Sequence, residues 1–160
     1  MLFRSVAGTH GKSTASGWLV HLLVHAGAEP SAFVGALLPA SLVGGVPATA
    51  RWGRGPAFVV EADEYAGNFD PYRPSIAVLL NAEWDHPDLF PDEASVLAAF
   101  EGWLTGPGAA DRTLIANTGD PGVARLVPRL RGRVGSIVTV ALGEPAAPGG
   151  GAATIGGRLG

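Results

Sequence analysis

Cysteine is absent from this 160-residue chain, and lysine occurs only once, at Lys12. Without thiols the chain has no disulfide, no cysteine nucleophile and no zinc–sulfur site, which fits a reducing compartment. Charged residues make up only 16% of the chain and the net charge is −3, which gives no basic surface for nucleic acid or an anionic membrane. No apolar run approaches the roughly 20 residues that a bilayer span needs, and the first residues do not resemble a signal peptide. These absences predict a soluble cytoplasmic protein with no nucleic-acid or membrane partner; they leave its oligomeric state open.

The single lysine stands against ten arginines, in a chain rich in alanine, glycine and proline. This composition indicates strong pressure towards arginine. A position that keeps lysine under that pressure requires a compact ammonium on a flexible stem, which a guanidinium does not replace. The alternative is chance retention of Lys12.

Apolar runs alternate with helical stretches along the chain, and the apolar fraction of 47% is enough for the core of one domain. The predicted strands are 3–7, 32–34, 57–60, 76–80, 113–116 and 137–142, and the predicted helices are 13–26, 91–104 and 121–130, with proline in the first turn of the second helix. The stretch from 35 to 56 reads as irregular, with room for a hairpin. Alternation of this kind predicts an α/β fold with a mainly parallel sheet flanked by helices. We assign residues 1–143 to the domain, and residues 144–160 to a Gly/Ala/Pro-rich tail or a truncated continuation.

A glycine-bearing loop follows the first predicted strand and opens the first predicted helix. Its residues are Gly8, Thr9, His10, Gly11, Lys12, Ser13 and Thr14. Backbone N–H groups at such a helix N-terminus bind phosphate, a lysine reaches the outer phosphates and a hydroxyl ligates Mg²⁺. The strict P-loop pattern requires glycine at position 6, where this chain has Val6. The alternative is a glycine-rich turn that caps a helix.

Acidic residues gather just after two of the predicted buried strands, whereas residues 1–60 hold a single acid, Glu29. Glu61 follows one strand, and Asn81, Asp85 and His86 follow the next. Ligands of open α/β sheets bind at this carboxyl edge, where the phosphate loop also opens. We predict that Glu61 contacts Mg²⁺ and that His86 holds a second cation or orients an oxygen. The alternatives are a capping acid for Glu61, and for His86 a turn histidine satisfied by Asp85 or by the nearby Asp88.

These motifs resemble the Mur ligase family, in its UDP-N-acetylmuramate–L-alanine ligase branch. Its nucleotide loop also lacks the first glycine, and a histidine at the position of His10 is typical of this branch. The branch motifs E-A-D-E and N-x-E-x-D-H are matched at 61–64 and 81–86, and Asn117–Pro121 is similar to the later D-D-P turn, with Gly119 in place of its first acid. The resemblance covers about residues 3–142 and implies a P-loop NTPase-like central domain.

The resemblance implies ATP and Mg²⁺ as cofactors. Lys12 would hold the β- and γ-phosphates, and Ser13 or Thr14 together with Glu61 would bind a first Mg²⁺. His86 would help to hold a second Mg²⁺, and Asn81 is a weaker nucleotide contact. The implied reaction moves the γ-phosphoryl group to a substrate carboxylate, and an amine then displaces phosphate to form an amide. Such chemistry depends on positioning and charge neutralisation rather than on a protein nucleophile.

The chain also departs from the family pattern. Tyr65-Ala66 follows the E-A-D-E motif, where this branch often has an acid second. The family plan adds one domain for the UDP-sugar and one for the amino acid, so we expect UDP-N-acetylmuramate and L-alanine to be bound by domains that this chain lacks. The expected function is the ATP-binding core of an acid–amino-acid ligase. The alternatives are a muropeptide-recycling or other ligase of the superfamily, and a nucleotide-binding module without ligase activity.

Overall fold

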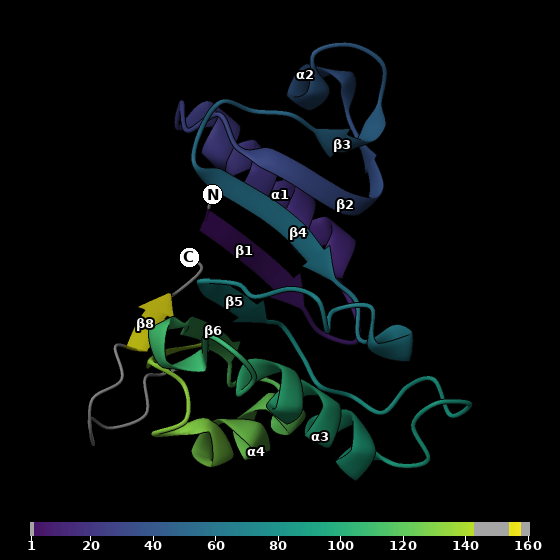
Figure 1. The fold of residues 1–160 in the computed structure, drawn as a ribbon, viewed down its shortest axis with the longest axis vertical. Helices are drawn as coiled ribbons and strands as arrows, with labels where there is room; N and C mark the ends of the chain where they lie inside the picture. Colours follow the sequence, from purple (N-terminus) through teal and green to yellow (C-terminus); the bar gives the residue numbers. More distant parts are fainter. Residues whose placement is uncertain (1, 143–153, 158–160) are drawn as a thin grey trace.

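The computed structural model describes residues 2–142 and 154–157. Eight strands of this part of the chain form one sheet, in the order β3-β2-β4-β1-β5-β6-β7-β8 (Figure 1). The strands are β1 (Leu2–Ala7), β2 (Ser31–Leu38), β3 (Ala48–Arg51), β4 (Ala57–Ala62), β5 (Ile76–Leu79), β6 (Thr113–Asn117), β7 (Ser136–Leu142) and β8 (Thr154–Gly157). All neighbours are parallel except β2 and β3, which confirms the predicted α/β class.

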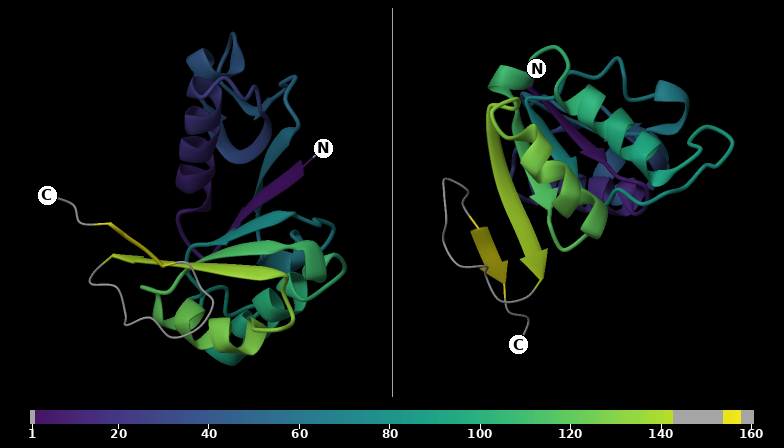
Figure 2. Two further views of the ribbon diagram at one scale, coloured as in Figure 1. Left: turned by 90° about the vertical axis from the view of Figure 1, so that its left-hand side faces the viewer. Right: turned by 90° about the horizontal axis from the view of Figure 1, so that it is seen from below.

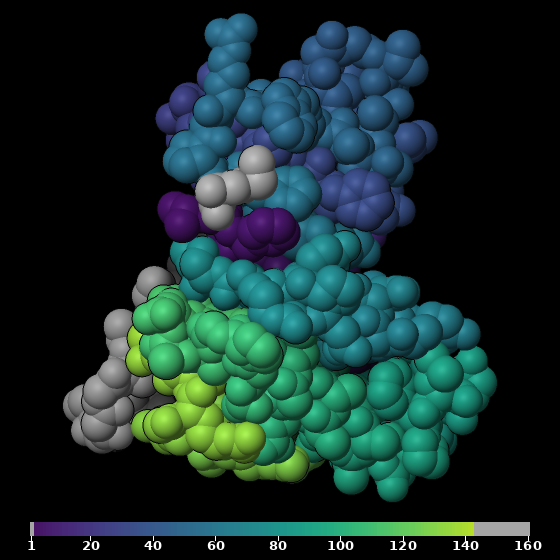
Figure 3. Space-filling model, viewed as in Figure 1, coloured from purple at the N-terminus to yellow at the C-terminus, as the bar shows by residue number. Residues whose placement is uncertain are grey.

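Helices cover both faces of the sheet (Figure 2). They are α1 (Lys12–His25), α2 (Ala40–Val43), α3 (Glu93–Leu104) and α4 (Pro121–Leu130), with 3₁₀ turns η1 (Tyr65–Gly67) and η2 (Ala109–Asp111). Val59 of β4 packs in one apolar cluster with α1 and α2, whereas Ala62 belongs to the cluster of α3 and α4. Residues three apart on a strand face opposite sides, so two separate cores hold the sheet between them. The space-filling view shows the β2–β3 part (blue) and the α3–α4 part (green) joined across the middle strands (Figure 3).

The chain leaves β1 and β5, which are neighbours, in opposite directions. From β1 it runs through α1 to β2, towards the β3 edge of the sheet, and from β5 through α3 to β6, towards the β8 edge. A sheet that reverses in this way leaves a crevice at the carboxyl ends of the two diverging strands, which is where open α/β sheets bind ligands. The predicted loop after β1 and the predicted polar cluster after β5 therefore meet at one point.

Several predicted boundaries were wrong. Strand β2 runs to Leu38 rather than ending at Val34, because its second half continues towards β3, with which it forms the antiparallel pair. Helix α3 begins at Glu93, and Pro91 lies before it: Asp92 is the N-cap and forms a capping box with Ser95. The four-residue helix α2 lies within residues 35–56, which the sequence predicts to be irregular.

The predicted tail, 144–160, contains β8, which pairs parallel with β7. The rest of that tail lies outside the described residues. Among the residues that the structure describes, no helix has the length and apolarity needed to cross a membrane.

Candidate functional site

The loop after β1 has the shape of a phosphate-binding loop. Strand β1 becomes fully buried towards Ala7, the chain turns at Gly8 with φ 141°, and Gly11 precedes α1 with φ 78°. A Cβ on Gly8 would lie 3.1 Å from backbone and side-chain atoms of Asn81, so both the dihedral angle and the space favour glycine. Val6, at the position of the missing glycine, lies inside β1 and pairs with β4 and β5. Its place in a strand explains why this loop needs no glycine there.

Side chains from two segments fix this loop against the loop that follows β5. The Asn81 Oδ1 accepts a hydrogen bond of 2.8 Å from His10 N, and its Nδ2 donates one of 3.1 Å to His10 O. The Thr9 hydroxyl donates to Glu83 O and accepts from Glu83 N, each at 3.0 Å. The His10 amide is thus already bonded, and Thr9 is buried. The amides of Lys12, Ser13 and Thr14 remain in the first helical turn, where no intrahelical acceptor exists.

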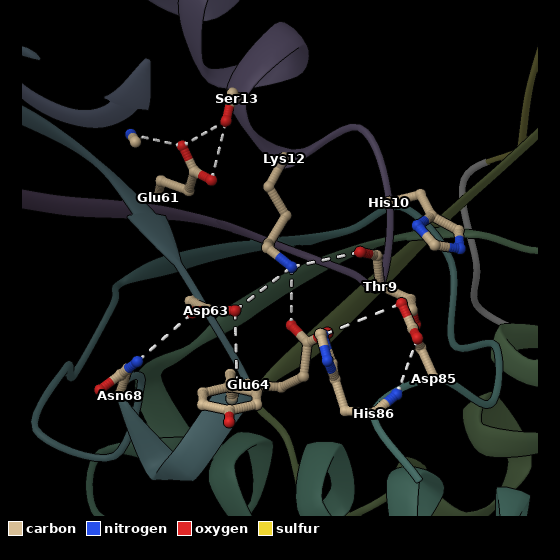
Figure 4. Close-up of polar contacts among 12 residues, drawn as sticks. Thr9, His10, Lys12, Ser13, Glu61, Asp63, Glu64, Asn68, Asp85 and His86 are labelled. Atoms are coloured by element: carbon tan, nitrogen blue, oxygen red, sulfur yellow. Dashed lines mark hydrogen bonds and ion pairs between the residues drawn. The ribbon is translucent and has the colours of Figure 1, made fainter. Parts of the chain in front are cut away.

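Lys12 points into the end of β4. Its Nζ lies 2.9 Å from Glu64 Oε2, 3.4 Å from Asp63 Oδ1 and 3.3 Å from Thr9 O (Figure 4). Its side chain is only 12% exposed. The lysine is therefore held at the centre of the predicted site, between two carboxylates for which the sequence reasoning gave no role.

Ser13 and Glu61 form a set of oxygen atoms beside Lys12. The Ser13 hydroxyl lies 2.9 Å from both carboxylate oxygens of Glu61. The N–H of Gly35 in β2 donates to Glu61 Oε2 at 2.6 Å, and a Cβ on Gly35 would lie 2.9 Å from that oxygen. Thr14 is exposed and lines an apolar cavity of about 300 Å³ with Trp18 and Leu37. Ser13 rather than Thr14 is the hydroxyl that meets Glu61.

His86 lies on the other side of Lys12 from Glu61 (Figure 4). Its backbone is left-handed, with φ 54°, and its N–H donates to Asp85 Oδ1 at 2.7 Å. The ring Nε2 is 3.8 Å from Asp85 Oδ2, and the ring packs edge-on against Tyr65. Asp85 is thus the partner that the turn interpretation of His86 expected, and the ring remains about one third exposed.

Asp88 fixes the other side of Tyr65. The Tyr65 hydroxyl donates to Asp88 Oδ2 at 3.1 Å. This hydrogen bond and the charge of Asp88 raise the pKa of the Tyr65 phenol above its ordinary value of 10.0.

In the described residues no three His, Asp or Glu side chains gather as a ready-made metal cluster, so Glu61 and His86 stand as separate candidate ligands.

The chain is similar to one family of enzymes. UDP-N-acetylmuramate–L-alanine ligase of Frankia casuarinae is 46% identical over 138 residues, 85% of this chain and 26% of that protein. The ligases of the same name from Frankia alni and Renibacterium salmoninarum are 45% and 42% identical over 79% and 84% of this chain, which are 20% and 28% of their own lengths. The chain thus spans about a quarter of the length of these curated relatives. Over that span, the chain belongs to the Mur ligase family.

Solved structures of Mur ligases have the same fold. The structure of UDP-N-acetylmuramate:L-alanyl-gamma-D-glutamyl-meso-diaminopimelate ligase from Neisseria meningitides matches with a TM-score of 0.73 and 28% identity, over 91% of this chain and 49% of that one. UDP-N-acetylmuramate-alanine ligase from Thermotoga maritima matches with a TM-score of 0.66 and 22% identity, over 89% of this chain and 29% of that one, which supports the fold alone. No protein-family model matches the chain.

Within this Mur ligase segment, the predicted site residues differ in their contacts. Lys12, Ser13 and Glu61 come together, whereas the polar groups of Asn81 and Thr9 are bonded to the protein itself. Sequence reasoning missed the contacts that Glu64, Asp63 and the Gly35 N–H make. The position of Glu64 after the same strand as Glu61 was the available signal.

Proposed function

We propose that this chain is the nucleotide-binding core of an ATP-dependent amide ligase of peptidoglycan precursor synthesis, which joins L-alanine to UDP-N-acetylmuramate. The observation that supports it most is Lys12 between the phosphate loop and the carboxylates that end β4, in a chain 42–46% identical to ligases of that name. The proposed reaction transfers the γ-phosphoryl group of ATP to the carboxylate of the UDP-sugar, giving an acyl phosphate and ADP. The amine of L-alanine then attacks the acyl carbon, and phosphate leaves.

The residues present fit Mg²⁺, which prefers oxygen ligands. The Ser13 hydroxyl and the Glu61 carboxylate offer such oxygens within 2.9 Å of each other, and we propose them as holders of the first ion. His86, with the Asp85 carboxylate beside it, would hold the second. When bound, Mg²⁺ neutralises phosphate charge. The first-turn amides of α1 and the Lys12 ammonium bind and orient the phosphates.

We also propose that residues 1–143 form a central domain and that the protein acts in the cytoplasm, where ATP is supplied. In the family, the UDP-sugar and the amino acid would be held by other domains. This arrangement is supported by the matched share of the curated relatives, which is 20–28% of their length.

A titration of the chain with a non-hydrolysable ATP analogue tests the proposal directly. We expect Mg²⁺-dependent binding in the high micromolar range, about −5 kcal/mol, which Lys12→Ala removes. Arg54→Ala is the matched control: it also removes one positive charge, but from an exposed residue before β4, at the opposite edge of the sheet. Equal binding by Lys12→Ala and wild type would place the nucleotide elsewhere and refute the proposal.

A second candidate is a muropeptide-recycling ligase, because the Neisseria enzyme named for a tripeptide substrate has the same fold at 28% identity. A third is a nucleotide-binding module without ligase activity. Phosphate release from ATP separates the three, measured with the family's UDP-sugar and amino-acid domains added back to this chain and with UDP-N-acetylmuramate present throughout. Release that requires L-alanine supports the first, and release that requires the L-alanyl-gamma-D-glutamyl-meso-diaminopimelate peptide supports the second. Mg²⁺-dependent binding without release under either condition supports the third.

A further inference from the structure

The ammonium of Lys12 has three hydrogen atoms to donate and three acceptors around it. They are Thr9 O at 3.3 Å, Glu64 Oε2 at 2.9 Å and Asp63 Oδ1 at 3.4 Å. A phosphate oxygen that binds Lys12 must therefore replace one of these three. Thr9 O belongs to the phosphate loop itself, so the acceptor that a phosphate oxygen replaces is one of the two carboxylates.

The two carboxylates differ in burial and in their other partners. The Glu64 side chain is 1% exposed, and its second oxygen, Oε1, is buried with no hydrogen-bond partner in the described residues. The Asp63 side chain is 40% exposed and also accepts from the Asn68 amide at 3.3 Å and from Tyr65 N at 3.4 Å. Loss of Lys12 would leave Glu64 as a buried, uncompensated charge, which is strongly unfavourable. Asp63 would keep its exposure to solvent and the hydrogen bonds that it accepts from Tyr65 N and Asn68.

We propose that Glu64 is a positioning residue that retains Lys12 at the phosphate loop, and that the nucleotide phosphate displaces Asp63. The inference rests on the proposed nucleotide site. Glu64 acts through Lys12 and touches no phosphate. Asp63 is the acceptor that occupies the place of the phosphate oxygen until nucleotide arrives. The two adjacent acids thus have opposite effects on nucleotide affinity.

Two single-charge variants of the full chain test this directly, with the Mg²⁺ complex of a non-hydrolysable ATP analogue as the probe. Glu64→Gln and Asp63→Asn each remove one negative charge from the same cluster, so relief of general repulsion towards phosphate is similar in both. We expect Asp63→Asn to bind about threefold more tightly than wild type because a competitor is lost. Glu64→Gln should bind about tenfold more weakly than wild type, since a charge-assisted hydrogen bond no longer orients Lys12. Equal shifts in the two variants, or tighter binding by Glu64→Gln, would overturn the inference.

A second measurement needs no nucleotide. Selective ¹³C labelling of lysine gives one side-chain signal, because the chain has a single lysine. Glu64→Gln should make the Lys12 ε-methylene markedly more mobile in ¹³C relaxation, and Asp63→Asn should leave it close to wild type. Similar relaxation in both variants overturns the positioning role of Glu64.

Two further outcomes, a Glu64→Gln variant that does not fold and a wild-type chain that binds no nucleotide, can also be interpreted. If Glu64→Gln does not fold by circular dichroism, Glu64→Asp keeps the charge and shortens its reach by one methylene. It should still weaken binding, and wild-type affinity in Glu64→Asp would overturn the inference. A wild-type chain that binds no nucleotide refutes the proposed function and with it the exchange at Asp63. The relaxation data then still decide whether Glu64 restrains Lys12.

Discussion

Asn81 lies after β5, yet both polar groups of its side chain bond to His10 in the loop after β1. Its expected contribution to nucleotide affinity is therefore through the shape of the loop. We predict that Asn81→Ala weakens binding of the ATP analogue about tenfold and costs roughly 1–2 kcal/mol of stability, the value of two partly exposed hydrogen bonds. Calorimetry and urea denaturation measure the two effects.

Asn81→Asp is the comparison for this prediction: it keeps the acceptor for His10 N but places a negatively charged oxygen, instead of a donor, beside His10 O. It should bind the ATP analogue at least as weakly as Asn81→Ala, because the added carboxylate also repels phosphate. Unchanged affinity in Asn81→Ala would show that the two hydrogen bonds do not shape the site.

Arg112 is a buried residue that stabilises the fold by hydrogen bonds to backbone carbonyls. It is 1% exposed, and its guanidinium donates to Pro74 O, Trp103 O and Pro107 O, each at 3.1 Å, and to Leu104 O. Burial, and secondarily the charge of Arg73, lower the pKa of Arg112. These carbonyls include the last ones of α3, where a cation complements the helix dipole.

We predict that Arg112→Lys costs roughly 2 kcal/mol in urea denaturation, because three donors on a flexible stem cannot serve four carbonyls in the geometry of a planar fork. Affinity for the ATP analogue should not change, since Arg112 precedes β6 at the edge of the sheet opposite to the phosphate loop. A variant as stable as wild type would contradict this account.

Helices α3 and α4 each have an aspartate as N-cap, Asp92 and Asp120, but the two caps differ in their surroundings. Asp92 accepts from Ser95 N at an exposed site. Asp120 is buried, and its Oδ1 accepts from Val123 N at 2.8 Å and from Ala82 N at 3.1 Å. Asp120 therefore joins α4 to the loop that follows β5, and a Cβ on Gly122 would lie only 2.1 Å from Ala82 O at the same junction.

We predict that Asp120→Ala costs about 2–3 kcal/mol and Asp92→Ala about 1 kcal/mol, since the first leaves a buried Ala82 N–H without its acceptor in addition to removing the cap. Thermal denaturation of the two variants compares them directly. Equal losses would mean that the hydrogen bond to Ala82 adds nothing.

Most elements were predictable because their signals are local. Strands β1, β4, β5, β6 and β7 are apolar runs, and α4 begins at Asp120-Pro121. The start of α3 was misplaced because Pro91 fits the first turn of a helix as well as the residue before a cap, and only the Asp92–Ser95 capping box decides between them. The length of β2 was missed because its second half has no alternating pattern.

The site was predictable in its residues and less so in its contacts. Glycines, a lysine and a hydroxyl in sequence order predict a phosphate loop with Lys12 and Ser13, and the end of an apolar run predicts the place of Glu61, which the structure puts against Ser13. That Asn81 bonds to His10, 71 positions away, follows from the neighbouring positions of β1 and β5 in the sheet, which no local pattern contains. The choice of Ser13 over Thr14 likewise depends on how α1 is rotated about its axis.

On the scale of the whole molecule, the sheet runs without interruption from β3 to β8, so a ligand bound at its middle should stabilise all of it. At a nucleotide concentration ten times the Kd, binding contributes about 1.4 kcal/mol, which corresponds to a rise in Tm of about 3–6 °C for a chain of this size. Differential scanning fluorimetry with the ATP analogue and Mg²⁺ measures it. A comparable rise in Lys12→Ala would contradict a single site at the phosphate loop.

The hydrogen bonds that connect Thr9 to Glu83 and His10 to Asn81 span 74 and 71 positions of sequence. During synthesis, the glycine loop leaves the ribosome long before the segment that shapes it, and loop closure over such a distance is slow compared with local helix formation. We therefore predict that the proposed nucleotide site forms late in folding. A nascent chain that ends before β5 would contain all residues of the phosphate-loop motif, but it would lack the hydrogen bonds from Asn81 and Glu83 that hold the loop in its shape.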